Sequence, residues 1–457
     1  MSMHILRGDG AKLRKSFNPA KIMVLGFVLI ILIGTVLLEL PAASRSGTTV
    51  PFFAALFTAT SATCVTGLTA TDTALTWSLF GRVVILVLIQ IGALGFMSIV
   101  TIFFFAMNRK IGLSQRLLLV KSLNLNDLQG VVKLIRHVLL GTLMFEALGA
   151  AALWLRFAPG YGLWGGLGMG VFHSVSAFCN AGFDLVEGAP FDSLAIYAGD
   201  WVITGTIILL SFIGGIGFFV WEDFWRNRRF KKLHLHSKLA LTISVILLAF
   251  GWVFFYLAER NNPLTIGGMP LHEAIFAALF QSAMPRSCGF SIFNQASLTG
   301  VSSMMAMVLM LIGGSAGSTA GGIKNVTAGI LFLSAIRVLR GRSRLSIFGR
   351  TIPELQIINA AAITVIVLIA CILGSAFIVI IHPELPFTAI IFETVSAIAT
   401  CGLSQGISPY LAPVPLMVII LFMFFGRLGI ITFGMATFIN REKTEIAKHP
   451  DTWVLMG

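Results

Sequence analysis

Charged residues are scarce in this chain of 457 residues: Asp, Glu, Lys and Arg together make up 11%, whereas hydrophobic residues make up 57%. The mean hydropathy is +0.92. So little charge beside so much apolar surface excludes a soluble globular protein and indicates a helical membrane protein with several spans. The apolar runs are long and continuous, without the residue-by-residue alternation of a transmembrane β-barrel.

The motifs of enzymes and metal sites are also missing. The sequence contains no C-x-x-C pair and no H-E-x-x-H motif, so a four-thiolate metal site built from its five cysteines is disfavoured. The titratable residues that a membrane-embedded enzyme would need are scattered and form no motif: Glu146, His173, Glu393 and Arg427. We predict that the chain is not an enzyme and binds no organic cofactor.

One short stretch recurs four times along the chain. In each copy a Ser-Ala pair precedes a glycine by a few residues, and in the third copy one extra residue separates the two. The four stretches are Ser61-Ala-Thr-Cys-Val-Thr-Gly67, Ser176-Ala-Phe-Cys-Asn-Ala-Gly182, Ser282-Ala-Met-Pro-Arg-Ser-Cys-Gly289 and Ser396-Ala-Ile-Ala-Thr-Cys-Gly402. The glycines are 115, 107 and 113 residues apart, and a period of this length predicts a repeated structural unit.

Each glycine follows a short apolar segment that lies between two longer ones. Residues 51–64 are too few to cross a hydrocarbon core of about 30 Å, whereas 22–40 are enough; a signal peptide is a second interpretation of 22–40. We predict an all-α membrane protein in which four consecutive helix–pore-helix–loop–helix units surround one pseudo-fourfold pore, with eight spanning helices. The predicted parts are a cytoplasmic N-terminus (1–21), unit 1 (22–107), unit 2 with its preceding linker (108–222), unit 3 with a broken second helix (223–340), unit 4 with its preceding linker (341–439) and a cytoplasmic tail (440–457).

The positive charges predict the orientation. Of 32 Lys and Arg residues, 26 fall in the two terminal segments and in 108–137, 222–240 and 323–356. This bias places those segments in the cytoplasm, so the formal net charge of +13 reflects membrane topology, not nucleic-acid binding. We expect a multi-pass protein of the cytoplasmic (inner) membrane, surrounded by lipid, with both termini cytoplasmic. Acidic residues such as Asp72 and Asp184 then lie outside, either in ordinary solvated loops or around a vestibule that attracts cations.

The four glycine loops suit a dehydrated cation. Rings of backbone carbonyls can replace its hydration shell without side-chain charge, and glycine allows the φ and ψ values that aim successive carbonyls at one axis. Close packing of helices at the glycines is a second interpretation, but it does not explain the repeated arrangement. The predicted cation filter consists of Val65, Thr66, Gly67, Asn180, Ala181, Gly182, Ser287, Cys288, Gly289, Thr400, Cys401 and Gly402.

Two features break the repeat. Five glycines within 313–322 cannot form a stable helix interior, so we predict a mobile loop that obstructs the pore below the filter; a rigid packing kink is the alternative. Arg427 lies near the middle of the last span, where a charge costs about 2.5–3.5 kcal/mol. We predict that Arg427 lines the pore and holds the loop, the alternative being an ion pair with Glu146. The predicted gate consists of Gly313, Gly314, Ser315, Ala316, Gly317, Ser318, Thr319, Ala320, Gly321, Gly322 and Arg427.

These features resemble the Trk/Ktr/HKT superfamily of potassium transporters. Pro285-Arg-Ser-Cys-Gly-Phe290 is similar to that family's third-loop signature, and Gly426-Arg427 to its last-helix signature. Without an extra helix pair before the first unit, the chain looks like the membrane subunit of a bacterial Ktr system. The resemblance implies a homodimer with one pore per protomer, a cytoplasmic ring of nucleotide-binding regulatory subunits and, in several members, stimulation by sodium. Family filters with glycine in all four loops favour potassium, and Gly67 places the chain among them.

We therefore expect potassium uptake through a carbonyl filter, with the Gly-rich loop and the arginine as gate and a nucleotide-binding subunit as regulator. A sodium or mixed-cation transporter of the same architecture is the alternative for the ion. A symporter that works by alternating access is the alternative for the mechanism, but the four units share one topology, which favours a fixed pore.

Overall fold

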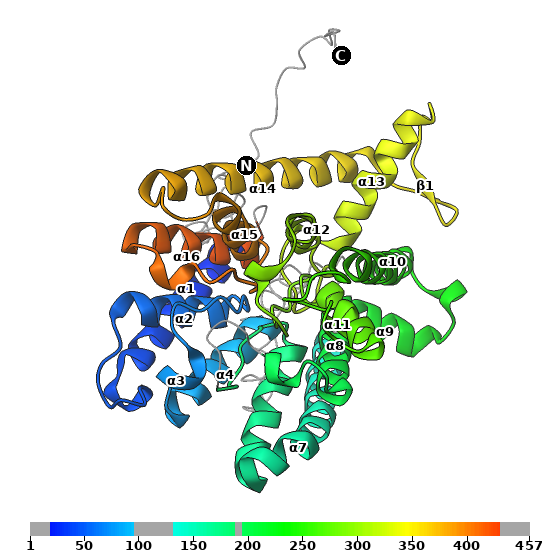
Figure 1. Cartoon of the computed structure of the whole chain (residues 1–457). Helices are drawn as coiled ribbons and strands as arrows, with labels where there is room; N and C mark the ends of the chain where they lie inside the picture. Colours follow the sequence, from blue (N-terminus) through cyan, green and yellow to red (C-terminus); the bar gives the residue numbers. More distant parts are fainter. Residues whose placement is uncertain (1–18, 96–130, 188–193, 430–457) are drawn as a thin grey trace, which may run out of the picture.

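The computed structural model describes residues 19–95, 131–187 and 194–429, and these residues are largely helical (Figure 1). The helices are α1 (Pro19–Glu39), α2 (Phe52–Thr63), α3 (Thr73–Thr76), α4 (Leu79–Leu94), α7 (Val131–Phe178), α8 (Trp201–Ile216), α9 (Phe218–Asn227), α10 (Leu235–Glu259), α11 (Leu271–Ala283), α12 (Gly300–Leu311), α13 (Asn325–Leu339), α14 (Glu354–Ile381), α15 (Phe387–Ile398) and α16 (Pro413–Leu428). A two-residue hairpin pairs β1 (Ser346–Ile347) with β2 (Arg350–Thr351), antiparallel.

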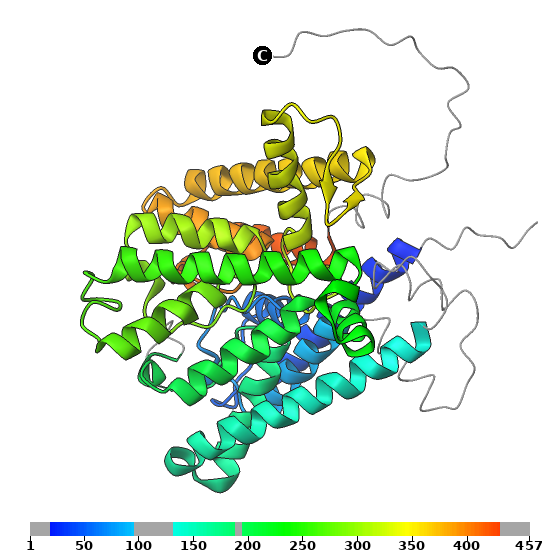
Figure 2. The ribbon, with the colours of Figure 1, turned by 90° about the vertical axis from the view of Figure 1, so that its right-hand side faces the viewer.

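Three of the four predicted short helices begin directly after a proline. The helix α2 follows Pro51, α11 follows Pro270 and α15 follows Pro386. Proline suits this place because a helix start leaves its first N–H groups unpaired in any case. The fourth is the C-terminal part of α7, which Gly162 (φ 75°, ψ 171°) separates from the long part. Figure 2 shows α7 as a long helix that reverses direction at one end.

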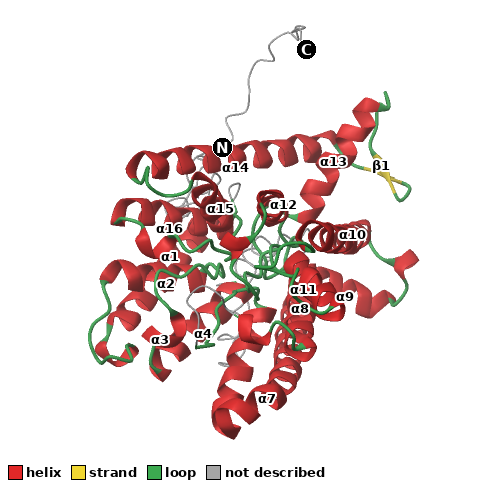
Figure 3. Cartoon of the chain, viewed as in Figure 1, coloured by secondary structure: helices red, strands yellow, loops and turns green. Residues whose placement is uncertain are grey.

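The short helices pack between longer ones. Contacts join α2 to both α1 and α4, α15 to both α14 and α16, and α11 to α10. Their interior faces are closely packed, and Phe57, Phe280 and Phe392 are fully buried. The loops that follow the short helices converge in the middle of the helical body (Figure 3).

Four described stretches are long and apolar enough to cross a membrane: Lys21–Glu39, Ile135–Phe178, Leu235–Glu259 and Glu354–Ile381. A fifth candidate is α8 with α9, which meet at 90°. The bend lies at Gly217, which takes φ 106°.

The other predicted spans are only partly visible. The helices α4, α12, α13 and α16 are shorter and apolar. The predicted units 1 (22–107) and 4 (341–439) extend past residues 95 and 429, where the description stops. The predicted tail 440–457, residues 1–18 and most of 108–137 also lie outside the described residues. The count of eight spans and the four-unit division stay predictions.

The break predicted in the third unit is present. Between α12 and α13, residues 312–324 form no helix. The loop starts and ends at one point, because Gly313 N donates to Ile323 O at 2.9 Å and Ile323 N to Leu311 O at 3.1 Å. The 313–322 segment is thus an inserted loop between two helix halves.

Candidate cation pathway

The four glycine loops share one unusual backbone conformation. Two residues before each glycine, a residue other than glycine has a left-handed φ between 46° and 73°; these residues are Val65, Asn180, Ser287 and Thr400. The glycines themselves have φ between 67° and 99°. Left-handed backbone is rare for side-chain-bearing residues and strained for a β-branched one. Its recurrence at the same place in all four loops shows that the loops are built alike.

The loops close into a ring. A Cβ atom built on each glycine would lie 2.2–2.6 Å from the carbonyl oxygen that precedes the next loop's glycine. The contacts run from Gly67 to Ala181, from Gly182 to Cys288, from Gly289 to Cys401 and from Gly402 to Thr66. No side chain fits there, so glycine is required by close backbone approach as well as by φ. The structure thus brings the four predicted filter segments together.

The hydrogen-bonded turn of the third loop is one residue shorter than in the others, although its Ser-Ala pair stands one residue farther from the glycine in the sequence. In three loops the residue six before the glycine offers its carbonyl to the N–H just before that glycine; these acceptors are Ser61, Ser176 and Ser396. In the third loop Met284, five before Gly289, accepts from Cys288 N at 3.0 Å. The Ser282-Ala pair therefore lies two residues earlier and does not correspond to the other Ser-Ala pairs.

Ser282 has a structural counterpart elsewhere in the second unit. Its hydroxyl donates to Leu248 O at 2.7 Å, just as the Ser174 hydroxyl donates to Glu146 O at 2.7 Å. Both carbonyls belong to the long helix that precedes the short one. Ser282 therefore corresponds to Ser174, and not to Ser176 of the second unit's Ser-Ala pair.

The Gly-rich loop lies directly against the ring. Thr319 Oγ1 accepts from Asn180 Nδ2 at 2.7 Å and donates to Phe178 O at 3.2 Å. Gly321 N donates to Ser287 Oγ at 2.9 Å. A Cβ atom on Gly321 would lie 1.7 Å from Thr400 Oγ1. The loop therefore contacts three of the four ring segments through groups at left-handed positions.

Arg427 joins the loop to the end of α4. Its guanidinium donates to Thr319 O in the loop, to Gly92 O at 2.5 Å and to Ala93 O at 3.1 Å. The ion pair with Glu146 is not the arrangement found, because Glu146 instead accepts from Gln90 Nε2 at 3.2 Å. Backbone carbonyls thus take the place of a carboxylate as the partners of this half-buried charge.

Comparison with known proteins identifies the family. The model of the TrkH cation transport protein family matches residues 13–448. The potassium/sodium uptake protein NtpJ of Enterococcus hirae is 37% identical over 98% of this chain and 99% of its own. The Ktr system potassium uptake protein B of Bacillus subtilis is 39% identical over 96% of this chain and 97% of its own.

This chain belongs to the TrkH cation transport protein family. It is an integral membrane cation transporter, not an enzyme. The solved structure of the potassium transporter TrkH from Vibrio parahaemolyticus matches with a TM-score of 0.72 and 15% identity, covering 94% of this chain and 86% of that one. At this identity the match supports the fold alone.

In this TrkH-family chain a cavity of about 70 Å³ lies against the ring. All four ring glycines line it, together with the side chains of Asp72 and Asp184. Both carboxylates also accept a backbone N–H, from Leu75 at 2.9 Å and from Val186 at 3.1 Å. The two acidic residues are thus held in the lining of the same cavity as the ring glycines, and a vestibule that attracts cations stays a prediction.

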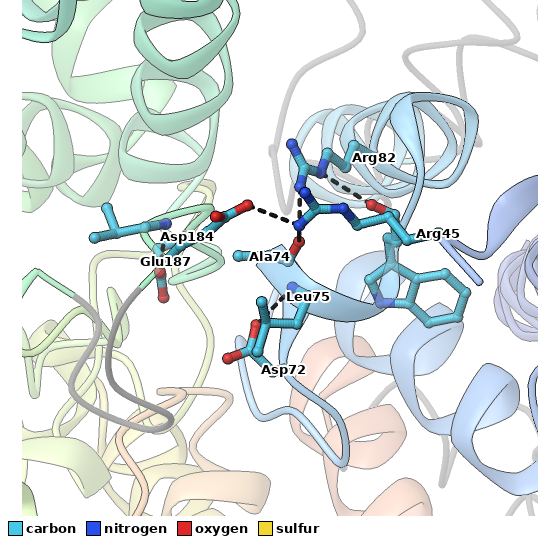
Figure 4. A network of polar contacts seen from close by, with 9 residues as sticks. Arg45, Asp72, Ala74, Leu75, Arg82, Asp184 and Glu187 are labelled. Carbon is cyan, nitrogen blue, oxygen red and sulfur yellow. Dashed lines mark hydrogen bonds and ion pairs between the residues drawn. The ribbon is translucent and has the colours of Figure 1, made fainter. Parts of the chain in front are cut away.

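A polar network near this cavity ties the first two units together (Figure 4). Arg45 pairs with Glu187 at 2.7 Å and donates to Ala74 O at 3.1 Å. Arg82 donates to the same carbonyl at 2.7 Å. The two arginines therefore lie near Asp72 and Asp184, but their guanidinium groups donate to Glu187 and to a backbone carbonyl.

A repeated Gly-x-x-Gly in the last helices escaped the sequence analysis. The pairs are Gly92 and Gly95, Gly214 and Gly217, and Gly426 and Gly429. A Cβ atom on the first of each pair would lie 1.9–2.2 Å from a carbonyl at the end of its own unit's short helix, and the second has φ between 79° and 106°. The spacing was visible in the sequence. It marks where three last helices approach a short helix and end at a glycine with positive φ.

Proposed function

We propose that the chain takes up potassium ions across the cytoplasmic membrane through a filter made of the four loops, in a pseudo-fourfold arrangement. The observation that carries the proposal is the closed ring of glycine-to-carbonyl contacts. Four backbone segments that meet in one ring can offer carbonyls from every side to a dehydrated ion. The names of the two relatives, both uptake proteins for potassium, support the choice of ion.

The short helices strengthen this site. The helices α2, α11 and α15 end at Thr63, Ala283 and Ile398, each a few residues before a ring glycine. A helix C-terminus carries a partial negative charge, which favours a cation in front of it. In the topology we propose, four such units with eight spans surround the pore, and both termini lie in the cytoplasm.

We further propose that residues 313–322 and Arg427 form the gate. The loop is anchored to the ring through Thr319 and Gly321, while Arg427 binds the carbonyl of Thr319. Because the same guanidinium also binds Gly92 O and Ala93 O, it connects three segments that must separate if the loop withdraws. Release of Arg427 would therefore free the loop and open the path below the filter.

The proposed assembly is a homodimer on a cytoplasmic ring of nucleotide-binding regulatory subunits, with sodium as stimulating ion. The name of the Bacillus subtilis relative, a component of a Ktr system, supports a partner for this chain. The alternative is a sodium or mixed-cation transporter of the same architecture. The name of the Enterococcus hirae relative includes both potassium and sodium, which supports this alternative.

Growth of a potassium-uptake-deficient bacterium at low potassium tests the proposal. The full chain is co-expressed with its regulatory subunit, and the wild type is compared with Gly67→Ser and with a deletion of 314–320. We expect rescue by the wild type, weaker potassium preference in Gly67→Ser and leakier flux in the deletion. No rescue despite membrane expression would contradict potassium uptake, and equal rescue at any sodium-to-potassium ratio would favour the mixed-cation alternative.

A further inference from the structure

Each short helix carries one buried polar side chain at the same place behind its loop. The residue lies nine positions before the ring glycine in three units and eight in the third, whose loop is one residue shorter. The four residues, each at most 1% exposed, are Thr58, His173, Gln281 and Glu393. Burying a polar group costs free energy unless it is hydrogen-bonded, so four polar residues at this depth indicate a shared role.

Glu393 makes the most extensive connection of the four. Its Oε1 accepts hydrogen bonds from Ser404 Oγ at 2.9 Å and from Ser408 Oγ. Ser404 lies two residues after Gly402 and lines the cavity against the ring, and its hydroxyl also accepts from Gly406 N at 2.8 Å. One side chain on α15 thus holds the segment that leaves the fourth loop at two points.

Two of the other three residues hold their own loops in the same way. His173 Nε2 accepts from Leu185 N at 3.4 Å, three residues after Gly182. Gln281 and Gln295 exchange two amide hydrogen bonds, at 2.8 and 3.2 Å. Thr58 differs, because its hydroxyl donates to Ala54 O within its own helix. The first loop therefore lacks this brace, which makes Thr58 a natural control.

The acidic group on Glu393 is not explained by packing. Its Oε2 is buried and has no hydrogen-bond partner within the described part of the chain. A buried oxygen left without a partner costs free energy, and an ionisable group inside a membrane protein is a candidate for a functional role. Gln281 shows that an amide suffices to hold an equivalent loop.

We propose that Glu393 is a positioning residue that determines ion specificity. By holding Ser404 and Ser408 it fixes the segment after Gly402, and with it the position of the fourth loop's carbonyls in the ring. This inference rests on the proposed function of the loops as a potassium filter. Discrimination between potassium and sodium depends on how well the carbonyls keep their places and number around the ion. Loss of the hydrogen bonds between Glu393 and the two serines should therefore lower the potassium-to-sodium uptake ratio more than it lowers the amount of folded protein.

The test is potassium and sodium uptake by the full chain in the same bacterium, with the same partner expressed throughout. The variants are Glu393→Ala, Glu393→Gln and Ser404→Ala, with Thr58→Val as the matched control. We expect Glu393→Ala and Ser404→Ala to lower the potassium-to-sodium uptake ratio about tenfold, the loss expected for one hydrogen bond to a charged group. Glu393→Gln keeps an acceptor, so its potassium-to-sodium uptake ratio should stay within about threefold of the wild-type ratio. Thr58→Val should have the wild-type ratio.

The outcomes separate this inference from the proposed function. A wild type without potassium preference would overturn the proposed function. A wild type that prefers potassium, with the preference weakened by Gly67→Ser but unchanged by Glu393→Ala, would overturn the role of Glu393 alone. If Glu393→Ala fails to reach the membrane, Ser404→Ala decides: a wild-type ratio there contradicts the inference, and a lowered ratio supports it.

Discussion

The last helix of the third unit and the last helices of the other three use glycine for different purposes. In the other units the first glycine of a Gly-x-x-Gly pair lets the helix approach its short helix: a Cβ atom on Gly214 would lie 1.9 Å from Phe178 O. In the third unit the glycines let a loop fold on itself and on a neighbouring unit. A Cβ atom on Gly313 would lie 2.0 Å from Gly321 O, and one on Gly321 would lie 1.7 Å from Thr400 Oγ1.

We call the helices with a Gly-x-x-Gly pair the frame, and residues 313–322 with Arg427 the insert. The frame is fixed, whereas the insert can be displaced. The closest contact of each pair runs from its first glycine to a carbonyl of the same unit's short helix, so breaking it should cost stability. The contacts of 313–322 are made with other units through single hydrogen bonds and through Arg427. Such contacts can be broken without unfolding a helix, as a gate requires. The predictions below test the ring, the insert, the frame and the surface in that order.

The largest effect is expected in the ring. Gly402→Ala places a Cβ atom 2.2 Å from Thr66 O at a residue with φ 99°. Neither the backbone carbonyl nor φ can adapt locally, so we expect potassium uptake to fall by at least about tenfold, with loss of potassium preference. Gly47→Ala is the matched control, because Gly47 also has a positive φ (70°) but nothing lies within 4 Å of its Cβ position. Uptake by Gly402→Ala at the wild-type rate and preference would argue against the ring.

The insert should respond with a gain of flux. Arg427→Gln removes the charged donor to Thr319 O, Gly92 O and Ala93 O. Each hydrogen bond from a charged group contributes about 1.5–3 kcal/mol, so the loop should be released and potassium uptake should rise about tenfold. Initial uptake rates at equal membrane expression measure this. A fall in the rate would indicate that Arg427 supports the open path instead.

The frame should respond with a loss of stability. Gly214→Ala directs a methyl group at Phe178 O, 1.9 Å away, and overpacking of this kind costs about 1–3 kcal/mol. In the same helix, Gly205→Ala meets nothing within 4 Å and should change the stability by less than about 1 kcal/mol. Thermal unfolding of the purified full chain in detergent compares the two. Equal midpoints would show that the Gly214 contact does not hold the frame.

The smallest effect is expected at the surface. Arg45 and Glu187 form an ion pair at 2.7 Å, with 48% and 49% of their side chains exposed. Solvent screens exposed pairs, which typically contribute about 0–1 kcal/mol. Arg45→Ala should therefore leave the unfolding midpoint within a few degrees of the wild type. A large drop would mean that the hydrogen bond from Arg45 to Ala74 O, and not the ion pair, stabilises this region.

Much of this arrangement was visible in the sequence because it depends on glycine and proline. The ring glycines recur at a nearly fixed period, and a glycine cluster predicted the break between α12 and α13. The register of the third loop could not be predicted, because hydrogen bonds to Met284 O decide it and any residue can offer a carbonyl.

The partners of Arg427 were hidden for the same reason. Three backbone carbonyls accept hydrogen bonds from its guanidinium. Because every residue has a carbonyl, neither composition nor spacing indicates which ones do so. An ion pair with Glu146 was the simpler expectation from side-chain charge alone. The bend at Gly217 was detectable, since its Gly-x-x-Gly spacing recurs in two other units.

Selective uptake by the four single variants Gly67→Ser, Gly182→Ser, Gly289→Ser and Gly402→Ser tests the central claim most directly. The potassium-to-sodium uptake ratio of each is measured beside Gly47→Ser in one expression background. Because every ring glycine faces the next loop's carbonyl at 2.2–2.6 Å, all four ring variants should lose potassium preference while Gly47→Ser keeps it. A ring variant that retains the wild-type ratio would contradict a filter made of four equivalent loops.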